Sequence, residues 1–179
     1  MLMPLMTPKA LFDAEPGELV RTGGPHGPIL GLVSGLHFDD PKMRKLLICL
    51  TPLGEHSRTP CYRTINEHSG TALSFGKDYL FVADPAVDAV DPRWDGGFYA
   101  AGALIVGEQH KFLQVVPMHP EVHHDVLSYD IDAGSTVAVH EPRPSCIVLK
   151  WEIRLKPNRE LDPPLAPLLK FETSSQSTR

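Results

Sequence analysis

Hydrophobic and polar residues alternate most regularly near the end of the chain, between Ser145 and Leu155. The apolar residues at every second position are Ile147, Leu149, Trp151, Ile153 and Leu155, and the residues between them are Val148 and three charged residues. Successive side chains of a strand point to opposite faces, so a period of two predicts a strand with one buried face. A helix would scatter these apolar side chains around its whole circumference.

Similar apolar segments, bounded by glycine, proline and asparagine, predict further strands. They span residues 18–21, 29–38, 45–51, 61–65, 71–83, 98–106, 111–117, 126–131 and 136–140. Within 45–51, residues 46–50 are all apolar, so periodicity alone does not separate a buried strand from a helix there, and we favour the strand. Segments 98–106 and 111–117 predict a hairpin, and 126–155 predicts an antiparallel meander of three strands. No internal repeat is visible in the sequence.

The chain contains 18 prolines among its 179 residues. Proline is excluded from helix interiors and from central strands, so its positions leave room for short strands and little room for long helices. The sequence therefore predicts a mainly β protein. We expect a single antiparallel barrel or sandwich of about eight short strands with a few short helical turns.

The same pattern predicts three regions. Residues 1–15 form a loosely attached leader, residues 16–156 form a single β-rich domain, and residues 157–179 form a proline-rich C-terminal tail without regular structure. The tail carries Leu165, Leu168, Leu169 and Phe171. These side chains are apolar enough to dock on a neighbouring surface or on a second copy of the chain, which would form a homo-oligomer.

Composition excludes several classes of protein. Hydrophobic residues make 42% of the chain, charged residues 22%, and the formal net charge is −5, a balance that disfavours nucleic-acid binding. No apolar run approaches the length that crosses a bilayer, and no secretory signal is visible, so we expect no membrane partner. The three cysteines show no CxxC spacing. We therefore expect a cytoplasmic protein with reduced thiols.

The densest group of ionisable residues is the histidine-rich segment 119–125, followed by His140. Imidazole is a common ligand of zinc and iron, and three converging side chains suffice for a site. His119 and His123 are spaced to share one face of a helical turn, and His140 would approach from the next strand. The alternative is a solvated histidine-rich turn, because the segment lacks the HExxH pattern.

Two other groups of residues are candidates for function. Trp94, Phe98 and Tyr99 flank a pair of glycines and could line a ligand-binding surface, although Phe98 and Tyr99 also begin a predicted strand, where one of them would face the core. Cys61 and His68 would form a nucleophile and base only if the fold placed them side by side.

Two functions follow from these observations. The first is a non-catalytic β-rich module that binds a small ligand, a partner protein or itself, and needs no cofactor. The second is a metal-dependent enzyme that uses the histidine cluster with a divalent metal such as zinc or iron. Because no complete catalytic motif is present, we favour the module, and whether the protein is an enzyme stays open.

Overall fold

The computed structural model describes residues 6–24, 26–36, 45–51, 60–84, 89–90, 101–118, 126–137, 146–156 and 166–172. In these ranges the chain is mostly strand, and the one helical element is the short 3-10 helix η1 (Leu11–Asp13). The prediction of a mainly β protein is confirmed.

The strands are β1 (Thr7–Ala10), β2 (Leu19–Gly24), β3 (Gly27–Leu36), β4 (Lys45–Cys49), β5 (Cys61–Ile65), β6 (Thr71–Gly76), β7 (Tyr79–Val82), β8 (Ala89–Val90), β9 (Leu104–Val106), β10 (Lys111–Pro117), β11 (Leu127–Asp130), β12 (Ser135–Val137), β13 (Cys146–Val148), β14 (Lys150–Leu155) and β15 (Leu169–Glu172). Twelve of them form one hydrogen-bonded sheet, and β15, β14 and β7 form a second sheet in that order.

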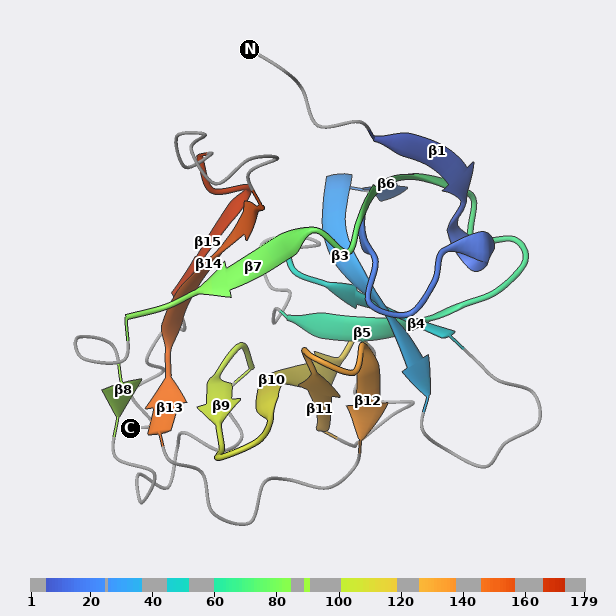
Figure 1. Cartoon of the computed structure of the whole chain (residues 1–179). Coiled ribbons are helices and arrows are strands. Elements are labelled where there is room, and N and C mark those ends of the chain that lie inside the picture. Colours follow the sequence, from blue (N-terminus) through green and yellow to red (C-terminus); the bar gives the residue numbers. More distant parts are fainter. Residues whose placement is uncertain are drawn as a thin grey trace.

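Six strands of the large sheet close into a barrel (Figure 1). Strand β4 pairs with β3 and β5, and β11 pairs with β10 and β12, always antiparallel. Parallel contacts of β5 with β10 and of β12 with β3 complete the ring. The expected single antiparallel barrel or sandwich of about eight strands is therefore wrong, because the ring has six strands and two of its contacts are parallel.

Each side of the barrel carries a three-stranded extension. Strands β2, β6 and β1 continue from β3, and strands β9, β13 and β8 continue from β10. Strand β13 belongs to the large sheet and β14 to the small one, so the single strand predicted at 145–155 is broken at Leu149. The predicted meander is correct for β11 and β12 and wrong for β13, which pairs with β8 and β9.

The strands form an internal repeat that the sequence did not reveal. Each pairing among β1–β6 has a counterpart of the same direction among β8–β13: β1 and β6 pair as β8 and β13 do, and β3 and β4 pair as β10 and β11 do. We call β1–β7 the first half of the chain and β8–β14 the second half. The contacts between the two halves are reciprocal: the β5–β10 pair corresponds to the β12–β3 pair, and β7 pairs with its own counterpart β14. This exchange is the pattern of a two-fold relation. Strand β15 has no counterpart among the described strands.

Residue registers agree with the repeat. Leu19 pairs with Leu32 in the β2–β3 hairpin, and Leu104 pairs with Leu113 in the β9–β10 hairpin. Two positions before the first residues of β2 and β9, Gly17 and Gly102 donate equivalent backbone hydrogen bonds of 2.7 and 2.9 Å to β3 and β10. Both glycines have a positive φ, +86° and +85°.

Two hydrophobic cores hold the fold together. The first includes barrel residues such as Leu32 and Tyr129 together with Trp151 and Ile153 of the small sheet. The second lies on the other face of β3 and β4, and it includes Leu47 of β4 and Leu11 of η1. Strand β4 is therefore buried on both faces, which explains why residues 46–50 are apolar without alternation and confirms the predicted strand there.

Both end segments contribute strands. Strand β1 pairs with β6, and Leu11 and Ala14 after it are fully buried. Strand β15 pairs with β14 of the same chain and places Leu169 and Phe171 against the first core. The described parts of the expected leader and tail are thus attached to the central domain, and the limits of that domain stay a prediction.

Candidate functional site

The residues of the predicted metal site and of the predicted aromatic surface lie outside the described residues. These are the histidines His119, His123 and His140 and the aromatic residues Trp94, Phe98 and Tyr99. Both the metal site and the aromatic ligand surface therefore stay predictions. Within the described ranges, His, Cys, Asp and Glu side chains form no group of three that could hold a metal ion.

Cys61 and His68 do not form a nucleophile and base pair. Cys61 is 1% exposed in the second core, where it pairs across β4 and β5 with Cys49, whereas His68 is exposed in the turn after β5. A hydrogen bond from Cys49 lowers the pKa of the Cys61 thiol, although burial opposes this, and Arg63 lowers it further. The same hydrogen bond and burial raise the pKa of Cys49. This pair is enclosed and offers no access to a substrate.

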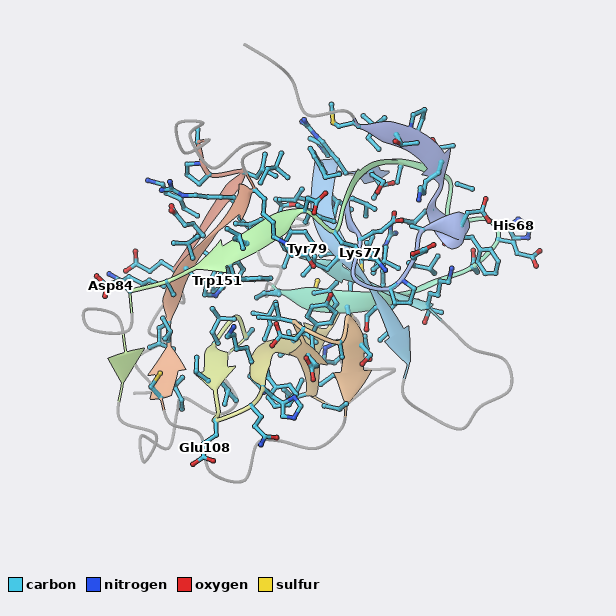
Figure 2. All side chains as sticks on the ribbon, in the orientation of Figure 1. His68, Lys77, Tyr79, Asp84, Glu108 and Trp151 are labelled. Carbon is cyan, nitrogen blue, oxygen red and sulfur yellow. The ribbon has the colours of Figure 1, made fainter. Side chains whose placement is uncertain are left out.

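A cleft of about 360 Å³ opens where the two halves meet. It is lined by Pro16, Gly17, Lys77, Tyr79, Leu80, Phe81, Lys111, Ile131, Asp132, Ala133, Gly134 and Lys156. Figure 2 shows Lys77 and Tyr79 near each other where β7 begins. We call this space the lysine cleft.

Three lysines from separate elements surround the lysine cleft. Lys77 lies in the turn before β7, Lys111 begins β10, and Lys156 follows β14. Lys77 forms an exposed ion pair with Glu15 at 3.2 Å. Within the described part of the chain, no ion pair is formed by Lys111 or Lys156. The cleft therefore concentrates positive charge on a chain whose formal net charge is −5, and such a site attracts anions.

Tyr79 supplies much of the apolar side of the lysine cleft. It is 9% exposed, its ring contacts Phe81 edge-on at 6.1 Å, and its hydroxyl donates a hydrogen bond of 3.0 Å to the Gly17 carbonyl. Burial raises the pKa of the Tyr79 phenol, and a hydrogen bond with Tyr129 only partly opposes this. The phenol is therefore neutral at physiological pH, and its proton is already engaged.

A rigid turn forms another wall of the lysine cleft. The Asp130 carboxylate accepts hydrogen bonds of 3.0 and 2.9 Å from the backbone N–H groups of Asp132 and Ala133. Gly134 ends the turn with φ of +68°, and a Cβ atom there would lie 2.8 Å from the backbone of Gly17. Glycine is needed at this position because the two halves of the chain approach each other so closely.

A second groove of about 520 Å³ lies on the small sheet, along β14 and β15. It is lined by Val82, Ala83, Asp84, Lys150, Trp151, Glu152, Lys170, Phe171 and Glu172. Its two lysines face three carboxylates, and Lys150 pairs with Glu172 at 2.9 Å. This groove is therefore less suited to an anion than the lysine cleft is.

The ionisable side chains that line the lysine cleft are the three lysines, Tyr79 and the exposed Asp132. Among these residues no nucleophile is paired with a base. No pattern in the sequence indicated this site, because Lys77, Lys111 and Lys156 are far apart in the chain and match no motif. Only the closure of the barrel and the contact between β7 and β14 bring them to one place.

Comparisons with known proteins do not assign the chain to a family. The chain matches no protein family, and no curated protein or solved structure is similar to it. In the described residues, no helix is long and apolar enough to span a membrane.

Proposed function

We propose that this protein is a non-catalytic binding module and that its lysine cleft receives an acidic group of a partner. The single observation that supports the proposal is the convergence of Lys77, Lys111 and Lys156 on one cleft in a chain of negative net charge. An ammonium group attracts carboxylates without further geometry, and the aromatic residues Tyr79 and Phe81 of the lining add apolar contact area. A nucleic-acid partner is disfavoured, because the whole chain would repel it.

The two grooves allow a matched test. We expect a hexaglutamate peptide to bind the full chain in low salt, with chemical shift changes at residues of the lysine cleft. The Lys111→Ala/Lys156→Ala variant should weaken binding about tenfold or more, because two ammonium groups are lost at once. The control is Lys150→Ala/Lys170→Ala, which removes the same charge from the other groove and should leave binding within about twofold.

Equal loss in both double variants would show that only net charge matters, and the proposed site would be wrong. The same conclusion would follow if hexaglutamate did not bind at all. The metal-dependent enzyme has no support among the described residues and stays a prediction about the histidine segment.

A further inference from the structure

Because the two halves repeat, β7 can be compared with β14. The edge compared in each strand is the one that does not face the other, which we call the outer edge. These strands are counterparts, and they pair with each other through Phe81 opposite Ile153. Tyr79 and Trp151 are equivalent: the Tyr79 hydroxyl donates a hydrogen bond to the Gly17 carbonyl, and the Trp151 indole N–H donates one of 2.6 Å to the Gly102 carbonyl. The two halves thus build the same local arrangement, a ring held against a glycine with positive φ.

In the second half, β15 occupies the place beside this arrangement. It pairs antiparallel with the outer edge of β14, and Phe171 stacks on Trp151 with ring centres 4.7 Å apart. The ring of Phe171 lies so close to Gly102 that a Cβ atom there would collide with it. Figure 1 shows β15 alongside β14, on the side opposite to β7.

In the first half, the equivalent place is the lysine cleft. Gly17 and Tyr79 line it, and a Cβ atom on Gly17 would lie 3.7 Å from the nearest atom, in the side chain of Lys77. Among the described strands, β7 ends the small sheet on this side. Among the described residues, no strand or aromatic ring fills the position that corresponds to Phe171, and the flexible side chain of Lys77 is the nearest group to it.

The backbone of β7 can accept another strand. The Lys156 N–H donates a hydrogen bond of 2.9 Å to the Asp78 carbonyl, which sets the register of β7 on β14. Backbone groups point alternately to the two edges of a strand, so those of Tyr79 and Phe81 point away from β14. In the second half, the carbonyl of Ile153, which is equivalent to Phe81, accepts a hydrogen bond of 2.8 Å from Leu168.

The outer face of β7 is also more apolar than that of its counterpart. Leu80 and Val82 are 44% and 37% exposed, whereas the equivalent residues of β14 are Glu152 and Arg154. Exposed apolar residues on an edge strand are usually avoided, because such an edge pairs with other chains. Their presence here is a second sign of a strand-binding edge.

We propose that the outer edge of β7 binds an extended, acidic segment of a partner protein as an added antiparallel strand. An aromatic side chain of that segment fills the lysine cleft against Tyr79 and Gly17, as Phe171 fills the equivalent place on Trp151 and Gly102. Acidic residues two positions from the aromatic residue lie on the same face of the added strand and supply the charge for Lys77, Lys111 and Lys156. This inference rests on the proposed function, and it specifies the shape and chemistry of the partner. Strand addition supplies affinity through backbone hydrogen bonds and specificity through alternate side chains.

The probe for this inference is the pentapeptide Glu-Leu-Phe-Leu-Glu with blocked ends. Its phenylalanine corresponds to Phe171, its glutamates lie two positions away on the same face of the strand, and its leucines lie on the opposite face, as the exposed Leu80 does on β7. Titration of the full chain is followed by NMR, together with hydrogen exchange of the Tyr79 and Phe81 amides. Two matched peptides serve as controls, one with Phe replaced by Ala and one with N-methylated backbone amides on the pairing edge.

We expect slower exchange at Tyr79 and Phe81, and binding about tenfold weaker or worse for each control peptide. If all three peptides and hexaglutamate bind equally and depend on Lys111 and Lys156, the strand inference is wrong and the anion-binding function stands. If none binds, both are wrong. If the protein self-associates and the pentapeptide does not compete, the occupant is a second copy of the chain, and a partner segment is excluded.

Discussion

Glu18 is a carboxylate that the fold buries with its partners already in place. It is 7% exposed, accepts hydrogen bonds of 2.8 and 3.0 Å from the Lys9 ammonium group, and accepts one of 2.7 Å from the Ser74 hydroxyl. Through these contacts one side chain on the approach to β2 joins β1 and β6. The equivalent residue in the second half is Ala103, so this polar link belongs to the first half alone.

The pKa of Glu18 makes this link dependent on pH. Burial alone would raise the pKa, but the hydrogen bonds from Lys9 and Ser74 outweigh it and hold the pKa below its ordinary value. A carboxylate with a lowered pKa in the folded state stabilises the fold above the unfolded pKa, and this contribution is lost as the pH falls through the folded pKa. Acid therefore weakens the attachment of β1.

We predict that Glu18→Gln lowers the free energy of unfolding by about 1–3 kcal/mol at pH 7, because the ammonium group of Lys9 loses its charged partner. Urea unfolding should show the difference from the wild type shrinking in acid, as the pH falls through the lowered folded pKa and the native carboxylate is protonated as well. The control is Glu15→Gln, an exposed residue, which should change stability by less than about 0.5 kcal/mol. A loss for Glu18→Gln that stays the same from pH 7 down to the acid unfolding of the protein would contradict the role of charge.

At the scale of single elements, the sequence predicted most strands correctly and missed the two-residue β8 and two strands at the ends. Alternation or an apolar run located β3, β4, β5 and β10, because each buries one or both faces. Strand β1 was missed because it lies in the expected leader, and β15 because the prolines before Leu169 indicated irregular chain. Both are edge strands, where proline nearby is tolerated, so local composition underestimates them.

For β15 we predict that Phe171→Ala lowers the free energy of unfolding by about 2–3 kcal/mol, because the substitution removes a stacked aromatic contact and leaves a cavity beside Gly102. The near-ultraviolet circular dichroism of the protein should change as well, since Trp151 loses its stacking partner. The comparison is Leu168→Ala, whose side chain is 38% exposed and should cost less than about 1 kcal/mol. Equal costs for the two substitutions would show that Phe171 does not anchor β15.

At the scale of the whole molecule, the sequence left a barrel and a sandwich as alternatives, and it predicted neither the six-stranded ring with its parallel contacts nor the repeat. The barrel closes through parallel contacts between segments far apart in the chain, such as Leu36 with Thr136, and such pairing leaves no local pattern. The two halves keep identical residues at structural positions, including Leu19 and Leu104, but the outer faces differ, since Leu47 corresponds to Ser128. The lysine cleft was missed for the same reason, because only the contact between the halves creates it.

The reciprocal contacts also determine how the chain can be divided. Each half leaves two of its barrel strands without a partner: β3 needs β12, and β5 needs β10. Side chains inside the ring are complementary as well, since Tyr62 of the first half corresponds to the smaller Thr136 of the second. In a dimer of two first halves, a second Tyr62 side chain would stand where the native barrel holds a threonine, and this would overpack the interior. We therefore expect each half to associate with the other half in preference to a second copy of itself.

We therefore predict that fragments 1–90 and 91–179 are each largely unfolded alone and regain β structure when mixed. Circular dichroism would measure the regained strand content, and gel filtration would show a one-to-one complex. The intact chain supplies the reference spectrum, and a mixture of each fragment with itself at twice the concentration is the control. A fragment that folds cooperatively as a monomer would show that the six-stranded ring is not the unit of folding, since such a fragment would have to satisfy β3 and β5, or β10 and β12, without their observed partners.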